Sequence, residues 1–500
     1  MKLKLVISVL LLGVALSGFT QEGLKGYDTK KVDVISWKGN KVVQSAEGYI
    51  IKSYKRKDFI YSFSVIGSKR RSKIRVQKFD LDFKELDKVD LNISDDYHFQ
   101  NLYELENGIG VEVIEKGRDK SKVTVSNFDF GKFKLTKNKI LVAELGRKDI
   151  HSGFDSHIFY TIKGHAINLD VSENGNYLVV ASYFYRKKKD TPTKVAVYNS
   201  KFELEYNKEI DLNKIEPELE YKGLWRFSVN NLGETNVFYT SSNDKRVAGK
   251  VKLARFNKEG MSFVNIPMEG INILDLKIVE KGNKFIIIQH EKMRIVKNEP
   301  FNMKHTGNLT ILELSENKQK FLETKIDIKS HLLKEGNDNK IIEVFVDSIN
   351  EGITIHFEAD GGWYDFETKK QSNHKLSIMA LKLNKDREVL WSTKIQKNQN
   401  YQDNTLYDGY AVYKNSEGNF CYIFNSNKKN HPGLKNKGFL WDGTIAHVTI
   451  DGATGKIIDE TVIHTNDSVK LDWETLEFES FGDTFLLGNK TSYLYLKKNN

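Results

Sequence analysis

The stretch Ala166–Ser182, AINLDVSENGNYLVVAS, holds an alternating segment and an apolar segment on either side of the turn Ser172-Glu173-Asn174-Gly175. This pattern predicts two antiparallel strands joined by a tight hairpin, because Asn-Gly readily takes the positive φ that such a turn requires. Two further strand-like segments follow, Lys194–Tyr198 and Phe202–Leu212. The sequence therefore indicates a unit of four strands.

This unit recurs along the chain. A glycine beside an acid or asparagine returns with gaps of 67, 58, 49, 70, 66 and 64 residues, at Gly108, Gly175, Gly233, Gly282, Gly352, Gly418 and Gly482. Self-similarity with a period of about 60 residues, and with strand patterning inside each unit, is typical of a β-propeller. We therefore predict an all-β propeller.

The two ends of the chain carry incomplete units. The last unit stops after its third strand, Tyr493–Lys497, and Val32–Val43 is free to supply the missing outer strand. Closing the ring with strands from both termini removes an open sheet edge that would otherwise pair with other chains. Counting this shared unit gives eight blades, and the alternative is seven.

One turn resembles a known propeller repeat. The run Val171-Ser172-Glu173-Asn174-Gly175-Asn176-Tyr177-Leu178 is similar to the Ser-Pro-Asp-Gly-Lys-x-Leu turn of TolB-type and WD-repeat-type propellers, with Glu-Asn in place of Pro-Asp. The resemblance covers one blade. It implies a fold, because such a pattern reflects packing and turn chemistry rather than a reaction.

A second resemblance is to quinoprotein-type (PQQ-like) propeller repeats, and it covers one to two blades. It rests on these segments: Gly443–Ala446, Asp451, Thr454-Gly455-Lys456, Ala380-Leu381 and Val389-Leu390-Trp391. Quinoprotein dehydrogenases carry a vicinal cysteine pair, whereas Cys421 is the only cysteine here. We therefore do not extend the resemblance to PQQ chemistry, and we expect no cofactor.

The N-terminus has the pattern of a secretory signal. Met1–Lys4 is a short basic region, Leu5–Ala15 is apolar, and Ser17–Thr20 supplies small residues for cleavage. We expect residues 1–20 to be a signal peptide cleaved near residue 20, residues 21–500 to form a single propeller domain, and the protein to be periplasmic or extracellular. An uncleaved anchor is the alternative, although the apolar run is shorter than the roughly 20 residues of a spanning helix.

The single cysteine excludes an internal disulfide. Cys421 lies inside the apolar segment Phe420–Phe424, and its sequence neighbours offer no base to form a thiolate. We expect it to be a small buried side chain. The stability of the chain must then come from packing.

Charge is distributed unevenly along the predicted unit. The connections between second and third strands hold 26 basic and 8 acidic residues, a net charge of +18, whereas the whole chain is +10. These connections are 67–73, 117–122, 186–194, 242–250, 290–304, 359–375 and 427–438. In a propeller they share one face, so the sequence predicts a basic face that concentrates anions. The opposite turns each carry an acid: Glu106, Glu173, Glu234, Glu280, Glu351, Glu417 and Asp483.

The predicted function is a non-catalytic binding or scaffold protein. Its basic face would engage an anionic polysaccharide, a cell-envelope component or an acidic protein; an exported chain would not meet nucleic acid, and we expect no transmembrane segment and a monomer. Flat aromatic rings would add contact area. The candidate binding residues are Lys69, Arg70, Arg71, Tyr185, Arg186, Lys187, Lys188, Trp363, Lys428, Lys429 and Trp441.

The alternative is a metal-assisted polysaccharide lyase or hydrolase with a propeller fold. His151, Asp155 and His157 follow one another in a long connection and are residue types that hold divalent metals. Their spacing matches no established metal motif. Charged lysine-rich hairpins have a simple explanation as well, since exposed loops favour charge for solubility.

Overall fold

The computed structural model describes the chain over most of its strands and turns. The described residues are 27–33, 48–66, 73–82, 84–93, 97–117, 119–146, 150–152, 160–162, 165–184, 193–211, 214, 221–242, 250–267, 276–281, 284–294, 303–314, 320–333, 338–347, 351–365, 370–397, 399–401, 410–426, 444–464, 479–480, 484–488 and 492–498.

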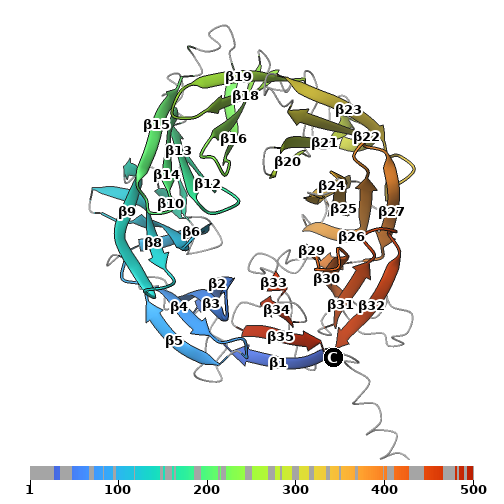
Figure 1. Ribbon diagram of the computed structural model, residues 1–500, viewed down its shortest axis with the longest axis horizontal. Helices are drawn as coiled ribbons and strands as arrows, with labels where there is room; N and C mark the ends of the chain where they lie inside the picture. The colour runs from blue at the N-terminus through green and yellow to red at the C-terminus, as the bar shows by residue number, and fades with distance from the viewer. Residues whose placement is uncertain are drawn as a thin grey trace, which may run out of the picture.

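These residues form antiparallel sheets arranged in a ring around a central axis (Figure 1). Within the described parts of the chain, seven sheets are built from four or five consecutive strands, and we call these sheets the blades. Their strands are β2 (Gly48–Arg56), β3 (Phe59–Ile66), β4 (Lys73–Phe79), β5 (Glu85–Asp90); β6 (Tyr97–Leu105), β7 (Gly108–Glu115), β8 (Lys120–Asp129), β9 (Lys134–Gly146); β12 (His165–Val171), β13 (Tyr177–Phe184), β14 (Thr193–Asn199), β15 (Leu204–Ile210); β16 (Tyr221–Val229), β17 (Thr235–Ser242), β18 (Lys250–Phe256), β19 (Met261–Ile266); β20 (Leu276–Lys281), β21 (Lys284–Arg294), β22 (Met303–Leu314), β23 (Phe321–Asp327); β24 (Asp338–Val346), β25 (Ile353–Asp365), β26 (Lys370–Leu383), β27 (Val389–Ile395), β28 (Gln399–Tyr401); β29 (Ala411–Lys414), β30 (Phe420–Ser426), β31 (Thr444–Ile450) and β32 (Ile457–His464).

A further sheet joins the two ends of the chain, and we call it the closing sheet. Its order is β1-β35-β34-β33, with β1 at Tyr27–Asp33, β33 at Glu479–Ser480, β34 at Thr484–Gly488 and β35 at Ser492–Lys498. Strand β1 pairs antiparallel with β35 from Tyr27↔Lys498 to Asp33↔Ser492. The terminal strands thus meet as the sequence predicted, but the N-terminal strand ends at Asp33, whereas the prediction placed it at Val32–Val43.

The predicted all-β propeller is confirmed. In the described residues the structure has seven blades of consecutive strands, which was the alternative number, together with the closing sheet. The preferred number of eight treated the shared sheet as a blade like the others. It differs from them because only three of its strands follow one another in the chain.

Position within a blade determines how much of a strand is buried. Strand β7, second from the axis, has seven of its eight residues buried, while the outer strand β5 has five of six residues exposed. Second strands are covered on both faces by neighbouring blades, so most of their side chains are buried and apolar, with some buried polar residues such as Glu112 among them. Outer strands have one free edge, and charges along it, as in β5, discourage pairing with other chains.

The turns between first and second strands use the repeated glycine in more than one way. Gly175, Gly233 and Gly418 have φ of +71°, +76° and +85°, as the hairpin prediction required. In the turn before β25 it is Glu351, not Gly352, that has a positive φ of 60°. Gly108 has no positive φ, and a Cβ there would lie 2.3 Å from the Phe128 carbonyl oxygen. The repeat therefore conserves the position of the turn more strictly than its backbone geometry.

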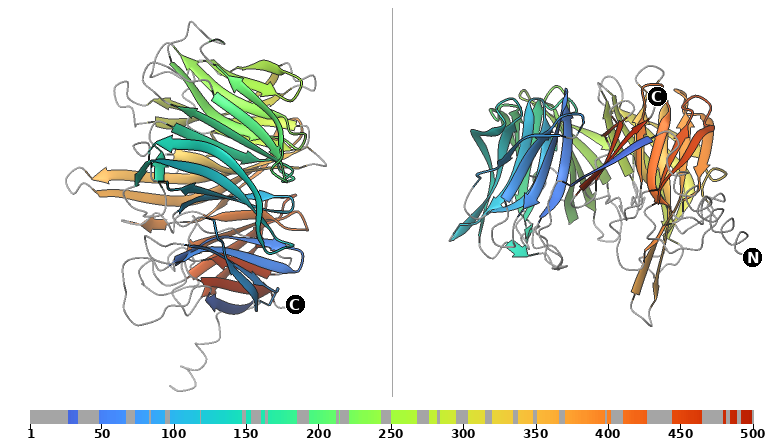
Figure 2. Two further views of the ribbon diagram at one scale, coloured as in Figure 1. Left: turned by 90° about the vertical axis from the view of Figure 1, so that its left-hand side faces the viewer. Right: turned by 90° about the horizontal axis from the view of Figure 1, so that it is seen from below.

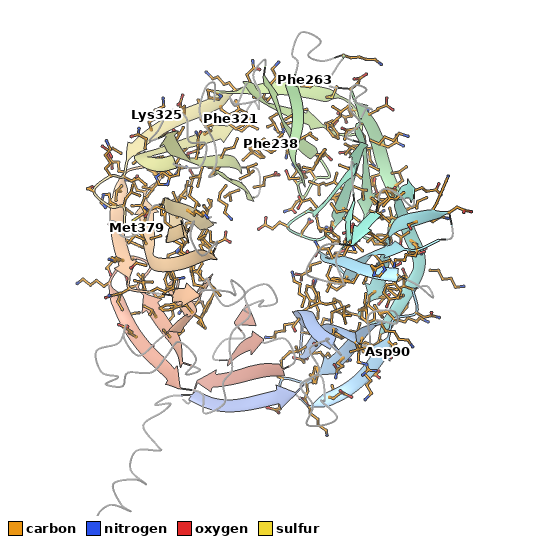
Figure 3. The ribbon with its side chains drawn as sticks, turned by 180° about the vertical axis from the view of Figure 1, so that it is seen from behind. Asp90, Phe238, Phe263, Phe321, Lys325 and Met379 are labelled. Carbon is orange, nitrogen blue, oxygen red and sulfur yellow. The ribbon has the colours of Figure 1, made fainter. Side chains whose placement is uncertain are left out.

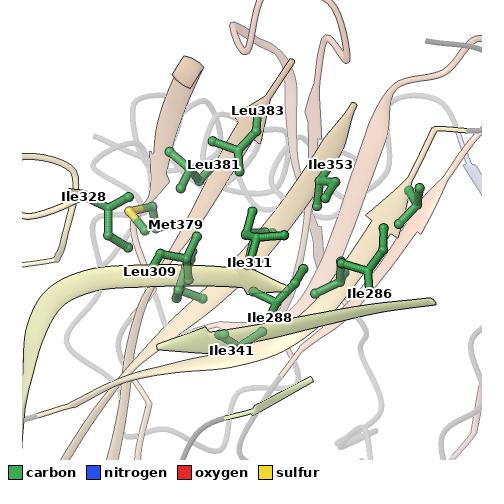
Figure 4. Packing of buried hydrophobic residues seen from close by; sticks show 14 of the residues in the cluster. Ile286, Ile288, Leu309, Ile311, Ile328, Ile341, Ile353, Met379, Leu381 and Leu383 are labelled. Carbon is green, nitrogen blue, oxygen red and sulfur yellow. The ribbon is translucent and has the colours of Figure 1, made fainter. Parts of the chain in front are cut away.

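The large hydrophobic clusters lie between blades. Ile288 and Leu309 of one blade pack with Ile355 and Met379 of the next, in the cluster seen in Figure 4. Aromatic rings join the preceding pair of blades: Phe238 stacks on Phe285 with centroids 5.5 Å apart. Each blade therefore completes its core only through its neighbours.

The outer strands carry both exposed and buried side chains at the rim of the ring. Phe263 on β19 is 42% exposed and Lys325 on β23 points outward, whereas Phe321 packs between two blades (Figure 3). Scattered exposed apolar residues of this kind are ordinary on a protein surface.

A buried carboxyl group lies in the second blade. The Tyr103 hydroxyl donates to Glu112 Oε2 at 2.8 Å. Burial raises the pKa of Glu112 from 4.5 to about 7, although the hydrogen bond from Tyr103 works in the opposite direction. The pKa of Tyr103 is raised by burial and by the nearby Glu112 charge.

Gly175→Ala tests the hairpin geometry. The added Cβ would lie 2.3 Å from the Glu106 backbone nitrogen at a φ of +71°, so we expect the free energy of unfolding to fall by about 2 kcal/mol or more in urea titration. Gly260→Ala is the matched control, because a Cβ there meets nothing within 4 Å; it should change stability by less than about 0.5 kcal/mol. Equal losses of stability in the two variants would contradict the positive-φ, closely packed turn at Gly175.

Glu112→Gln tests the buried carboxyl group. Because the pKa of Glu112 is higher in the folded state (about 7) than its ordinary 4.5, the unfolded chain loses this proton first as pH rises. The contribution of Glu112 to stability therefore falls between pH 4.5 and 7. We compare the free energy of unfolding of Glu112→Gln with that of the parent, both measured in urea. This difference should shift in favour of the variant by up to about 3 kcal/mol between pH 5 and pH 8. The control, Glu417→Gln at an exposed acid, should have the same effect on stability at both pH values. If the effect of Glu112→Gln does not depend on pH either, the raised pKa of Glu112 is refuted.

Candidate functional site

The antiparallel order of the strands gives the ring two faces. Connections from second to third strands, and from one blade to the next, lie on one face, which we call the loop face. Turns from first to second and from third to fourth strands lie on the other, which we call the turn face (Figure 2). This division is the one that the charge analysis of the sequence assumed.

Most of the predicted binding residues lie outside the described residues. Those residues are Lys69, Arg70, Arg71, Tyr185, Arg186, Lys187, Lys188, Lys428, Lys429 and Trp441. The strands on either side of them are described, and their last pairs are Ile66↔Lys73, Ser182↔Lys194 and Ser426↔Thr444. The structure thus brings the two ends of each of these segments together at the loop face of its blade.

Trp363 lies on a hairpin that extends beyond the ring. Strands β25 and β26 are 13 and 14 residues long, and their outer part projects from the loop face (Figure 2). The backbone of Trp363 pairs with Ser372 in this part. The short strand β28 pairs with the same hairpin at Asn373–Lys375 and widens its base.

The predicted metal residues are described only in part. His151 lies in the small hairpin of β10 (Ile150–Ser152) and β11 (Tyr160–Ile162), where its backbone pairs with Thr161. Asp155 and His157 lie outside the described residues. Among the residues that are described, no group of three or more His, Cys, Asp or Glu side chains is arranged to hold a metal ion.

The turn face contains a pocket of about 280 Å³ near the axis. Its walls come from four successive blades, at the ends of strands β12, β16, β20 and β24 and in the turns that follow the first two. The lining residues are Asp170, Val171, Glu173, Ser228, Val229, Asn230, Asn231, Ile278, Val279, Glu280, Glu343 and Val344. We call it the hub pocket. Among the described residues, four carboxyl groups and no basic side chain line it.

Both carboxyl oxygens of Glu280 in the hub pocket accept side-chain hydrogen bonds. Ser228 Oγ donates to one carboxyl oxygen, and Asn236 Nδ2 donates to the other at 3.1 Å. Burial raises the pKa of Glu280, and the negative charge of Asp170 raises it further, while the two hydrogen bonds oppose the shift. The carboxyl groups of two different blades are therefore close enough to repel each other.

The neighbouring acids are also held in place. Asp170 Oδ2 accepts a hydrogen bond from the Val229 backbone nitrogen at 3.2 Å, and Glu343 Oε1 accepts one from Val344 at 2.9 Å. The sequence analysis identified Glu173 and Glu280 as turn-face acids but missed Asp170 and Glu343. The available signal was an acid flanked by apolar residues at the end of a first strand.

A buried ion pair lies between the last two blades, on the side of the loop face. Lys397 is 1% exposed and donates to Glu358 Oε1, and its Nζ lies 5.5 Å from the centre of the Tyr410 ring. Burial raises the pKa of Tyr410 well above its usual value. The pair fixes the segment after β27 against β25, at the base of the projecting hairpin. No local sequence pattern indicates this pair, since the partners are 39 residues apart.

Cys421 is buried, as its sequence context predicted. Its sequence neighbours offer no base, but the fold supplies one across the sheet, because His447 comes from the adjacent strand. Burial raises the pKa of the Cys421 thiol, but hydrogen bonds with His447, Tyr413 and Thr449 outweigh this and lower it. Asp459 Oδ2 lies 3.8 Å from His447 Nδ1. Sequence neighbours alone could not reveal a partner that pairs across the sheet.

No helix in the described part of the chain is long and apolar enough to cross a membrane. No protein-family model and no curated protein matches the sequence.

Solved structures with a similar fold do exist. The "Dos1 propeller" is 12% identical with a TM-score of 0.42, covering 90% of this chain and 93% of that chain. Polysaccharide lyase Uly1 is 8% identical with a TM-score of 0.39, covering 96% and 94%. The β-propeller domain of the Trilobed protease from Pyrococcus furiosus is 8% identical with a TM-score of 0.34, covering 70% and 98%. At these identities and TM-scores the similarity indicates nothing about the function of this chain.

Proposed function

We propose that this chain is an exported, non-catalytic binding propeller whose loop face engages an anionic polysaccharide, an anionic component of the cell envelope or an acidic protein. The observation that carries the proposal is the common direction of the connections between second and third strands. In all seven blades these connections leave from the same side of the ring.

The charge of these connections supports an anionic partner. They hold 26 basic and 8 acidic residues, while the net charge of the whole chain is only +10. Charges of one sign gathered around a ring raise the local concentration of the opposite ion and speed its capture. At 0.1 M salt the screening length is about 10 Å, so binding of this kind weakens strongly as salt is added.

Aromatic residues in the same connections would add to the contact. Trp363 lies on the projecting β25–β26 hairpin, and Tyr185 and Trp441 lie in connections that begin and end at the loop face. Flat rings beside charged groups suit the apolar faces of sugars or a partner's surface. In this proposal the basic residues attract the partner and the rings orient it.

The test compares two sets of charge reversal, with a heparin fragment as the probe. The loop-face variant changes Lys187, Lys188, Lys428 and Lys429 to Glu. The control variant changes the exposed Lys137, Lys201, Lys385 and Lys456 to Glu, on β9 near the turn face or in turn-face connections. Both lower the net charge by the same amount. We expect the loop-face variant to lose at least tenfold in affinity at low salt, and the control to lose less than about threefold.

Heparin affinity should also fall steeply with salt for the parent protein. Absence of binding at low ionic strength would refute the proposal. Equal losses in the two variants would refute it as well, since binding would then follow net charge rather than the loop face.

A further inference from the structure

The hub pocket lies on the opposite side of the ring from the proposed loop-face partner, and it has the opposite charge. It is a half-open hollow, and inner strands and turns from four blades line it. Its volume of about 280 Å³ is just below the range of roughly 300–1,000 Å³ typical of small-molecule sites. A small ligand is therefore the appropriate size.

The arrangement of its acids argues against a bare metal ion. Asp170, Glu280 and Glu343 come from three different blades, and no group of three acidic or imidazole side chains in the described residues is close enough to hold one metal. An organic cation is larger and can approach separate carboxylates in turn, since an ammonium group has three donors.

The rest of the lining is mixed: Ser228, Asn230 and Asn231 are polar, and five residues are apolar. Val171, Val229, Ile278, Val279 and Val344 stand among the carboxyl groups. Such a surface suits a methylene chain that ends in a charged group, as in the side chain of lysine. The pocket thus combines a place for an alkyl stem with fixed acceptors for a cationic head.

Two of the acids are fixed in place from the neighbouring blade or its turn. Glu280 accepts hydrogen bonds from Ser228 and Asn236, and Asp170 accepts one from the Val229 backbone. Arg255, whose charge lowers the pKa of Glu280, is itself bonded to Glu234 and Asn236. Carboxylates that are held close together in a partly buried site favour a bound cation, which relieves their repulsion.

We infer that the hub pocket binds a primary alkylammonium group. The group can belong to a free diamine or to a lysine side chain of a partner protein, and the chemistry recognised is the same. Glu280 and Asp170 accept hydrogen bonds from the ammonium head, and the valine and isoleucine side chains cover the stem. This site is independent of the loop face, so either can exist without the other.

Calorimetric titration of the full-length protein tests the inference with two probes, 1,5-diaminopentane and Nα-acetyl-lysine methylamide. We expect saturable binding, and tighter binding of one probe identifies the source of the ammonium group. Glu280→Gln keeps the acceptor for Ser228 and removes the charge, so it should weaken binding at least tenfold. Glu343→Gln removes a carboxylate of another blade and should also weaken binding of the probe.

Glu106→Gln is the matched control, because Glu106 is an exposed acid on the turn face that does not line the pocket. It should change affinity by less than about threefold, and thermal unfolding should show that all variants are folded. The inference fails if neither probe binds, if Glu280→Gln and Glu343→Gln leave affinity unchanged, or if calcium displaces the bound ammonium probe at equal concentration.

Discussion

The structure depends on apolar packing between neighbouring blades. Every large hydrophobic cluster contains residues from two adjacent sheets, and the second strands are buried on both faces. A blade on its own would expose both faces, at a cost of about 1.5–3 kcal/mol for each large apolar side chain returned to water. The ring must therefore close, and the closing sheet achieves this by pairing β1 with β35.

The same geometry separates the molecule into two chemically different faces. Because neighbouring strands of a blade run in opposite directions, every second connection lies on the same side of the ring. The long basic connections therefore lie on one face and the short turns that carry acids lie on the other. The innermost strands approach one another near the axis, and side chains that are far apart in the sequence meet there. Asp170 and Glu280 come together in the hub pocket for this reason.

Local patterns made much of the fold predictable. The stretch Ala166–Ser182 predicted a hairpin, and β12 and β13 form it with the turn at Gly175 in the positive-φ region. Pairing of the two chain ends followed from the incomplete last unit. The position of β1 was harder to predict, because several apolar segments before residue 48 could serve as an outer strand. Only the pairing with β35 shows which segment does so.

The candidate sites were less predictable, since they depend on contacts between blades. Lys397 and Glu358 are 39 residues apart, and His447 reaches Cys421 only across a strand pair. Sequence reasoning recognised the charge of Glu280 but not the Asp170 that faces it from two blades away. Such partners are set by ring curvature and sheet stagger, which no local pattern records.

The position of β1 has a consequence for how the chain can be connected. Tyr27 and Lys498 are direct partners in the closing sheet, so the first and last described residues lie side by side. At this one pair of strands the ring is closed by hydrogen bonds between β1 and β35 and not by a chain connection. Circular permutation, with the old ends linked and new ones opened at a loop-face connection, would preserve each ladder of hydrogen bonds and move the gap to a different sheet.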